Sequence, residues 1–318
     1  MKTADITGKA DNLRGRDLLS ILDLSYKDIQ LIFNTTGLLK VGLSRESQLN
    51  LLPGKTLAMI FEKPSLRTRV TFEAGMTQLG GHAIYLGPSD AQIGKRETVA
   101  DAARNLERWV DCIMARVFAH STVAGLAEYA NVPVINGLCD IEHPCQALAD
   151  IYTMKEKKGE LKGLKLAFIG DGNNVCNSLM LLSAKLGVNF AAACPKGYEP
   201  NEDITARAKE IAAENGAEIE IVTDPAEAAK NADALYTDVW ASMGQEQEAE
   251  ERKRIFASYQ INQSLVNAAK EDVIVLHCLP AHRGQEITDE VMDGPHSVVV
   301  DEAENRLHVQ KALLVLML

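Results

Sequence analysis

The stretch that decides the fold runs from Lys55 to Gly81 and reads KTLAMIFEKPSLRTRVTFEAGMTQLGG. Its first eight residues, Lys55–Glu62, form an apolar run of the kind that makes a buried strand. Pro64 then forces the chain out of strand geometry, and the next residue is a favourable N-cap for a helix over Ser65–Leu79. Gly80 and its neighbour end that helix. Strand, turn and helix in this order are the repeating unit of a parallel α/β sheet.

The same alternation continues along the rest of the 318 residues. At roughly 100 to 200 residues per domain, this length predicts two domains. The runs that favour strands are Lys55–Glu62, His82–Gly87, Cys112–Val117, Val132–Gly137, Leu164–Gly170, Asn189–Pro195, Glu218–Thr223, Ala234–Trp240, Val273–Pro280 and Ser297–Val300. The pattern predicts the α/β class, with two doubly wound parallel-sheet domains joined by interdomain helices.

The expected boundary lies where a helix starting at His143 runs into the polar, glycine-containing stretch Lys155–Gly163. We therefore expect a first domain over residues 1–150 and a second over residues 151–302. The C-terminal helix, about residues 303–318, is expected to pack back on the first domain. The charged segment Gln245–Arg254 is expected to be a solvated helix or loop.

Charge and cysteine content exclude several classes of protein. The chain carries 33 Lys and Arg against 44 Asp and Glu, a net charge of −11, which repels nucleic acid and anionic membranes, so neither is expected as a partner. An anionic ligand therefore needs a local basic pocket. The six cysteines include no CxxC pair and no zinc-type spacing, so no metal is expected. The first thirty residues are too charged for a secretory signal, and no run reaches the ~20 apolar residues of a membrane span, which predicts a cytoplasmic protein.

Residues that follow strands are the candidates for chemistry, because ligands of open parallel sheets bind beyond the carboxyl ends of strands. The first such segment is Ser65-Leu66-Arg67-Thr68-Arg69. Amides at the start of a helix, together with two arginines, make an anion site. An ordinary capped helix with surface arginines would have the same spacing.

Three further candidates follow strands of the first domain. Arg116 closes a strand and can point inward. His143 and Gln146 lie three residues apart at the start of a helix, where the histidine can donate to a carbonyl oxygen and the amide can bind an NH₂ group. A purely structural histidine at a helix start is the more common case.

The second domain offers candidates of weaker specificity. Asp238 leaves a strand and could fix an ammonium group, while Ser242 and a neighbouring amide could hold a carboxylate. Cys278 also ends a strand, although a buried cysteine taken alone is usually an inert small hydrophobe. Arg306 follows the run Ser297–Val300 and is either an anion contact or a surface charge.

A glycine turn, Gly170-Asp171-Gly172-Asn173-Asn174, connects a strand to a helix. It is similar to a dinucleotide fingerprint only superficially, because the third glycine of GxGxxG is missing. Asparagines at a helix start suit a carboxylate better than a pyrophosphate, and a plain capped turn is equally compatible. A Rossmann-type NAD oxidoreductase therefore stays as a remote alternative.

Taken in this order, the segments resemble the carbamoyltransferase family over nearly the whole chain. The family's phosphate motif, Ser-x-Arg-Thr-Arg, stands here as Ser65–Arg69, with Leu66 where threonine is common, and its His-Pro-x-Gln motif stands as His143–Gln146. The motifs Asp-x-x-x-Ser-Met-Gly and His-Cys-Leu-Pro, carried here by Asp238–Gly244 and His277–Pro280, are typical of the members that use ornithine.

The resemblance implies an enzyme that transfers the carbamoyl group of carbamoyl phosphate to the δ-amino group of L-ornithine. The products are L-citrulline and phosphate, the context is arginine metabolism, and no cofactor is needed. It also implies a homotrimer or a multiple of trimers. Carbamoyl phosphate would be bound by Ser65, Leu66, Arg67, Thr68, Arg116, His143, Gln146, Cys278, Leu279 and Arg306, with Gln92 reaching in from a neighbouring subunit. Ornithine would be bound by Asn174, Asp238, Ser242 and Met243.

The resemblance also implies catalytic roles for Arg116, His143, Asp238 and Cys278. The arginine and the histidine would polarise the carbonyl oxygen, Asp238 would hold the α-ammonium group, and Cys278 would assist loss of the δ-ammonium proton. The near alternatives are a carbamoyltransferase for putrescine or N-acetylornithine. A non-catalytic ligand-binding relative is a further alternative.

Overall fold

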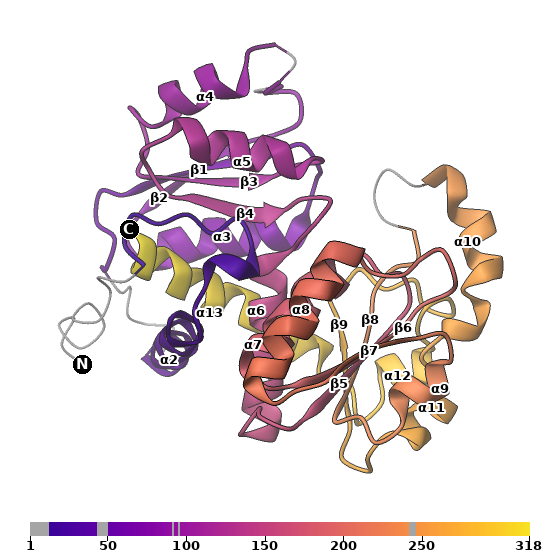
Figure 1. Cartoon of the computed structure of the whole chain (residues 1–318). Helices are drawn as coiled ribbons and strands as arrows, with labels where there is room; N and C mark the ends of the chain where they lie inside the picture. Colours follow the sequence, from indigo (N-terminus) through magenta and orange to yellow (C-terminus); the bar gives the residue numbers. More distant parts are fainter. Residues whose placement is uncertain (1–12, 43–49, 91, 95, 242–245) are drawn as a thin grey trace. The chain divides into compact units, whose positions relative to one another are not determined.

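The computed structural model describes residues 13–42, 50–90, 92–94, 96–241 and 246–318, and the chain divides into two compact units (Figure 1). Unit 1 comprises Met1–Cys145 with Arg306–Leu318, and unit 2 comprises Gln146–Asn305. Each division falls inside a helix, the first in α6 (Pro144–Lys158) and the second in α13 (Val299–Met317).

Unit 1 is built on a four-stranded parallel sheet in the order β2-β1-β3-β4. Its strands and helices are β1 (Thr56–Phe61), β2 (His82–Leu86), β3 (Cys112–Arg116), β4 (Val134–Leu138), α2 (Tyr26–Gly42), α3 (Leu66–Gln78), α4 (Val99–Leu106) and α5 (His120–Tyr129). The central strand β3 is buried throughout, as expected for a parallel strand covered on both faces. The core between these strands and their helices includes Ile60, Ile113 and Val123.

The ends of the chain complete unit 1. Leu18 forms a parallel bridge to Ile135, so the N-terminal segment covers the edge strand β4. The unit 1 part of α13, drawn in yellow, lies beside α3, where Lys311 Nζ donates to Gln78 Oε1 at 3.0 Å (Figure 1). The C-terminal helix is thereby attached, through Lys311, to the helix that follows β1.

Unit 2 is built on a five-stranded parallel sheet in the order β7-β6-β5-β8-β9. Its strands are β5 (Lys165–Ile169), β6 (Asn189–Ala193), β7 (Ile219–Val222), β8 (Ala234–Thr237) and β9 (Ile274–His277). Its helices, besides its parts of α6 and α13, are α7 (Asn174–Leu186), α8 (Glu202–Asn215), α9 (Pro225–Ala229), α10 (Ala249–Ile255), α11 (Gln263–Ala268) and α12 (Asp289–Met292).

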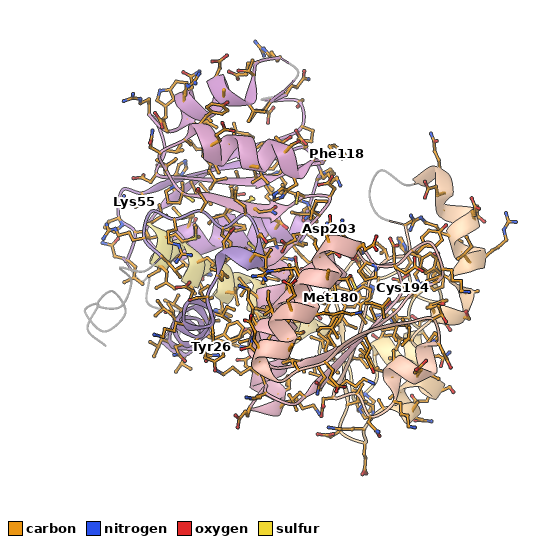
Figure 2. All side chains as sticks on the ribbon, in the orientation of Figure 1. Tyr26, Lys55, Phe118, Met180, Cys194 and Asp203 are labelled. Carbon is orange, nitrogen blue, oxygen red and sulfur yellow. The ribbon has the colours of Figure 1, made fainter. Side chains whose placement is uncertain are left out.

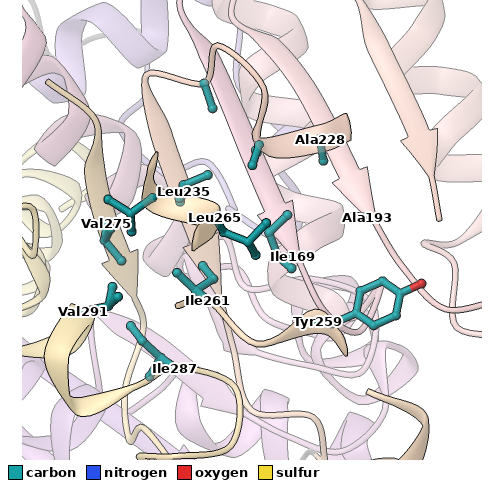
Figure 3. Packing of buried hydrophobic residues seen from close by; sticks show 14 of the residues in the cluster. Ile169, Ala193, Ala228, Leu235, Tyr259, Ile261, Leu265, Val275, Ile287 and Val291 are labelled. Atoms are coloured by element: carbon teal, nitrogen blue, oxygen red, sulfur yellow. The ribbon is translucent and has the colours of Figure 1, made fainter. Parts of the chain in front are cut away.

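The core of unit 2 is aliphatic with a small aromatic cluster. Ile169, Leu235 and Val275 come from three neighbouring strands and pack with Leu265 of α11 (Figure 3). Met180 of α7 and Cys194 after β6 are fully buried, whereas Phe118, just after β3 in unit 1, is half exposed (Figure 2).

The α/β class with two parallel sheets is confirmed, and nine of the ten expected strands are present. The tenth, Ser297–Val300, is wrong, because only Ser297 forms a single bridge, to Val275, and α13 already begins at Val299. The compact units divide after Cys145 and after Asn305. The expected limits of the functional domains, at residues 150 and 302, stay a prediction. In Gln245–Arg254 the described part is helical and largely exposed, but Arg252 is buried.

No helix in the described ranges is both long enough and apolar enough to cross a membrane.

Candidate functional site

Strand order identifies one candidate position in each unit. In unit 1 the order of winding reverses between β1 and β3, and in unit 2 it reverses between β5 and β8. Helices that leave neighbouring strands on opposite faces open a crevice at the carboxyl ends of those strands. The candidate site residues are therefore those after Phe61 and at Arg116 in unit 1, and those after Ile169 and Thr237 in unit 2.

The start of α3 presents amide groups beyond β1. Ser65 is the N-cap, and its Oγ accepts from the Thr68 backbone N–H at 3.2 Å. The first amides of a helix lack carbonyl partners within the helix and carry the positive end of its dipole. The Leu66 side chain is 74% exposed, so this position can serve an anion through its backbone N–H, and replacing the common threonine with leucine leaves that N–H in place.

Arginines gather around this helix start. Arg116 ends β3 directly opposite Phe61 of β1 and is buried, and Arg306 of α13 is also buried. Arg306 Nη2 donates to Thr68 Oγ1 at 3.1 Å, which joins the C-terminal helix to the first turn of α3. The sequence predictions for Thr68, Arg116 and Arg306 therefore converge on one place in unit 1.

His143 lies within the electric field of these arginines. Burial lowers the pKa of His143 well below its usual value, and the charges of Arg306, Arg116 and Arg67 lower it further. The imidazole is therefore neutral near pH 7 and can donate through one nitrogen. A neutral donor among guanidinium groups is suited to a ligand that carries both an anionic group and a carbonyl oxygen.

Gln92 is the remaining residue of the predicted carbamoyl phosphate site in unit 1. It lies in the connection between β2 and α4, its side chain is exposed, and its φ of +45° is unusual for a residue with a side chain. Its expected role across a subunit boundary stays a prediction.

The candidate position in unit 2 contains a thiol, a carboxylate and an amide. Thr237 of β8 pairs with His277 of β9, so the next residue of each strand, Asp238 and Cys278, lie side by side. Cys278 Sγ donates to Asp238 Oδ1 at 3.0 Å. Asn173 Nδ2 donates to the other carboxylate oxygen at 2.8 Å, so the Asp238 side chain is held on both sides.

Burial and the Asp238 carboxylate set the protonation of Cys278. Burial raises the pKa of Cys278 well above its usual value, and the charges of Asp238, Glu302 and Asp150 raise it further. The group is therefore a neutral thiol near pH 7, not a thiolate nucleophile.

The turn after β9 has an unusual backbone. Leu279 has a φ of +58°, and its N–H donates to His277 Nδ1 at 2.9 Å. The other ring nitrogen of His277 contacts Glu286 Oε1 at 3.0 Å, with both side chains fully buried. The imidazole thus fixes the turn that follows β9.

Asp238, His277 and Cys278 are also a group whose ligand atoms lie within 4.8 Å of one another, close enough to suggest a cation. Both ring nitrogens of His277 are, however, already engaged by Leu279 and Glu286. A metal would have to displace one of these buried hydrogen bonds, so the chemistry of this set fits a hydrogen-bonded thiol better than a metal centre.

Gln146 is held by two carboxylates. Its Nε2 donates to Asp150 Oδ1 at 2.7 Å and to Glu302 Oε1 at 3.2 Å, and all three residues are buried in unit 2. His143 belongs to unit 1 and Gln146 to unit 2, and their expected joint action stays a prediction.

Asn174, the first residue of α7, follows the N-cap Asn173 and is partly buried. The residue before it, Asn173, makes the hydrogen bond to the carboxylate of the candidate site. Ser242 and Met243 lie outside the described residues.

The glycine turn Gly170–Asn174 does not form a binding site for a pyrophosphate group. A side-chain carbon on Gly172 would lie 2.2 Å from the Pro200 backbone nitrogen and 2.4 Å from the Glu199 carbonyl carbon. Gly172 is therefore needed for close packing of the chain on itself, whereas the second glycine of a dinucleotide fingerprint leaves space for the ligand. This observation argues against the NAD oxidoreductase.

Several residues of these sites did not stand out in the sequence. Asn173 is an N-cap by position, but its bond to Asp238 needs the β5–β8 pairing. Asp150 lies four residues after Gln146, a helical spacing at which side chains meet, and so was detectable. Glu302 lies 156 residues from Gln146 and gave no local signal.

Comparison with known proteins assigns the family. The model of the aspartate/ornithine carbamoyltransferase carbamoyl-P binding domain matches residues 16–156, and that of the Asp/Orn binding domain matches residues 162–317. The chain belongs to the aspartate/ornithine carbamoyltransferase family. As a carbamoyltransferase, it carries the two family domains in the family order.

Curated relatives of this carbamoyltransferase are similar over nearly its full length. The ornithine carbamoyltransferase of Pyrococcus horikoshii is 56% identical, with 96% of this chain and 97% of that protein covered. The anabolic ornithine carbamoyltransferase of Pyrococcus furiosus is 55% identical, with 96% and 98% covered.

Solved structures of ornithine carbamoyltransferases are similar to this chain as well. An ornithine carbamoyltransferase from Pyrococcus furiosus superposes with a TM-score of 0.93 at 56% identity, covering 96% of this chain and 97% of that one. One from Thermus thermophilus gives 0.84 at 46% identity, covering 94% and 97%. The family predicted from the sequence motifs is thereby confirmed.

Proposed function

We propose that this chain transfers the carbamoyl group of carbamoyl phosphate to the δ-amino group of L-ornithine, giving L-citrulline and phosphate in arginine metabolism. The observation that carries the proposal is the Cys278–Asp238 pair beyond β8 and β9, in a chain whose other unit gathers arginines around a helix start. Relatives named ornithine carbamoyltransferase support it at 54–56% identity.

Unit 1 supplies the groups for carbamoyl phosphate. In the proposal the phosphate binds at the backbone N–H groups of Ser65 and Leu66, at the Thr68 hydroxyl and at the Arg67 guanidinium, and Arg306 adds a further cation. Arg116 and neutral His143 donate to the carbonyl oxygen. Their contribution grows as that oxygen becomes an oxyanion, and removing one such donor typically costs about 3 to 4 kcal/mol.

Unit 2 supplies the groups for the amine and for the carbamoyl nitrogen. Asp238 receives the α-ammonium group, while Asn174, Ser242 and Met243 receive the α-carboxylate. Gln146 and the carbonyls of Cys278 and Leu279 accept from the carbamoyl NH₂ group. These assignments are carried by donor and acceptor type: carboxylate to ammonium, amide to carboxylate, carbonyl to NH₂.

The reaction requires a neutral amine. An alkylammonium group ionises near pH 10.4, by analogy with lysine, so it must lose a proton before attack. The neutral thiol of Cys278, polarised by Asp238, can accept a hydrogen bond from the δ-amine at sulfur without adding charge to the site. The δ-ammonium proton passes to water before attack. Nitrogen then attacks the carbonyl carbon and the N–C bond forms, the C–O bond to phosphate breaks, and the departing phosphate takes the second proton from the attacking nitrogen.

Citrulline formation from carbamoyl phosphate and ornithine by the purified protein tests the proposal. Arg67→Ala should abolish turnover and carbamoyl phosphate binding together, and retained activity in that variant would contradict the site assignment. A panel of ornithine, putrescine and N-acetylornithine tests the acceptor. N-acetylornithine lacks the free α-ammonium group that Asp238 favours, and putrescine lacks the α-carboxylate assigned to Asn174, so ornithine should react fastest.

The proposed assembly is a homotrimer, or a multiple of trimers, in which Gln92 completes the site of a neighbouring subunit. Exposed Leu66, Val70 and Ile84 on α3 and the edge strand β2 support a subunit contact on that side of unit 1. Light scattering measures the mass in solution.

Mixing Gln92→Ala with His143→Ala subunits tests the sharing of a side chain. Mixed trimers should regain activity, because some sites then receive Gln92 from one subunit and His143 from the other. Absence of any recovery in trimers shown to be mixed would place Gln92 and His143 of each site in the same subunit.

A further inference from the structure

Glu302, a residue of the first turn of α13 with no assigned role, has the contacts of a residue that organises the carbamoyl-binding groups of unit 2. We infer that Glu302 is a positioning residue, which holds Gln146 and the end of β9 so that their acceptors converge on the carbamoyl NH₂ group. The inference rests on the proposed function and extends it.

One buried carboxylate joins three elements. Glu302 is 1% exposed, and its Oε1 accepts from Gln146 Nε2 of α6 at 3.2 Å and from the Tyr236 hydroxyl of β8 at 3.4 Å. Its Oε2 accepts from the backbone N–H of His277, the last residue of β9, at 2.8 Å. Since burying a carboxylate is costly without donors, this set of three is what makes the position of Glu302 tolerable.

The two carboxylates around Gln146 determine which end of its amide faces a ligand. Ionised carboxylates only accept hydrogen bonds, so the group facing Asp150 and Glu302 must be the NH₂ group of Gln146. The amide can therefore present only its oxygen to a ligand. An acceptor is what the carbamoyl NH₂ group requires.

The contact with His277 acts on the neighbouring acceptors. The residues that follow His277 are Cys278 and Leu279, whose carbonyls the proposed function directs at the same nitrogen. Glu302 fixes the strand end immediately before them through the backbone, while the His277 ring fixes Leu279 through its N–H. Glu302 thus contacts both Gln146 and the strand end that precedes the carbonyl acceptors assigned to that NH₂ group.

An amide cannot replace this carboxylate. A glutamine at position 302 would offer one acceptor oxygen and one NH₂ group to two N–H donors, those of Gln146 and His277. One contact must break or the Gln146 amide must turn over, which would present a donor to the carbamoyl NH₂ group.

The test compares Glu302→Gln with a matched control in the full-length protein. The control is Asp301→Asn, which removes the same charge from the preceding residue, a half-exposed aspartate paired with Lys157 at 2.5 Å. Carbamoyl phosphate and inorganic phosphate are each titrated by calorimetry, and citrulline formation gives kcat and KM for both substrates.

We expect Glu302→Gln to weaken carbamoyl phosphate binding and lower kcat, each by about 10- to 100-fold, with inorganic phosphate binding and melting temperature close to those of Asp301→Asn. This split separates positioning from a structural role, because a general loss of folding would lower phosphate binding as well. If Glu302→Gln does not fold, Glu302→Asp, which keeps two acceptor oxygens on a shorter side chain, should show the same split with a smaller loss.

Carbamoyl phosphate binding and kcat within twofold of the control would overturn the inference, as would equal losses for both ligands. Failure of the proposed function would look different, because the unmodified protein would then form no citrulline. The calorimetric comparison needs no turnover and still decides whether Glu302 controls binding of the carbamoyl group.

Discussion

The Asn173 side chain both caps α7 and holds Asp238, and two substitutions distinguish these contributions. Its Oδ1 accepts from the backbone N–H groups of Val175 and Cys176 at 2.9 and 3.1 Å and so caps α7, while its Nδ2 donates to Asp238 Oδ2 at 2.8 Å. Asn173→Asp keeps an oxygen for the cap but places a second carboxylate against Asp238. Asn173→Ala removes both functions.

The two effects have different sizes. Aspartate and asparagine are equally good N-caps, so Asn173→Asp should leave the cap intact, whereas Asn173→Ala should lower the free energy of unfolding by about 1 kcal/mol through the cap alone. A hydrogen bond to a charged group contributes about 1.5 to 3 kcal/mol, which corresponds to a loss of about 10- to 150-fold in kcat/KM for ornithine. Two carboxylates this close also favour sharing a proton, so Asp238 loses charge toward the α-ammonium group.

The assays are urea unfolding and steady-state citrulline formation with ornithine varied. Asn262→Asp is the control, because Asn262 caps α11 through the same two contacts, to Ser264 and Leu265 at 3.0 and 3.2 Å, in another part of unit 2. If Asn173→Asp keeps kcat/KM within threefold of the Asn262→Asp value, the proposed hold of Asn173 on Asp238 is refuted.

Three other outcomes are expected. Arg306→Gln should weaken inorganic phosphate binding by about 10- to 100-fold, measured by calorimetry. It should also raise the pKa of His143, measured by NMR titration, because it removes the charge that lowers that pKa most. An unchanged His143 pKa would contradict the placement of Arg306 beside His143. The unfolded chain binds a proton at His143 near pH 6.5, whereas the folded chain does so only at lower pH. The free energy of unfolding should therefore fall by up to about 1.4 kcal/mol per pH unit below pH 6.5. His143→Gln should lack this part of the pH dependence when unfolding is measured by urea titration. Gly172→Ala should destabilise the protein by about 1 to 3 kcal/mol or prevent folding, since the added carbon meets the Pro200 backbone at 2.2 Å, and an unchanged unfolding midpoint would refute that packing argument.

Local sequence signals were sufficient wherever the chemistry depends on neighbours in the chain. Pro64 and the N-cap Ser65 predicted the start of α3, and the apolar runs predicted the strands. Both features depend on only a few consecutive residues. Strand ends then indicated Arg116, Asp238 and Cys278 through the general rule for parallel sheets.

Signals failed where distant segments decide the outcome. The β-branched run Val298–Val300 favours a strand, yet Val300 is 77% exposed and α13 begins at Val299, so only Ser297 bridges the edge strand β9, at Val275. The contacts of Glu302 with Gln146 and His277 likewise depend on folding, and no pattern around Glu302 distinguishes it from the exposed acids of the same helix turn.

The contact between Cys278 and Asp238 in unit 2 depends on the alignment of β8 with β9. Asp238 and Cys278 meet because Thr237 is aligned with His277, and successive residues of a strand point to opposite faces. Insertions or deletions in the 36 residues between β8 and β9 could therefore accumulate without separating sulfur from carboxylate, provided the alignment holds. A slip of β9 by a single position would carry the sulfur to the opposite side of the sheet while leaving every side chain of the pair chemically intact.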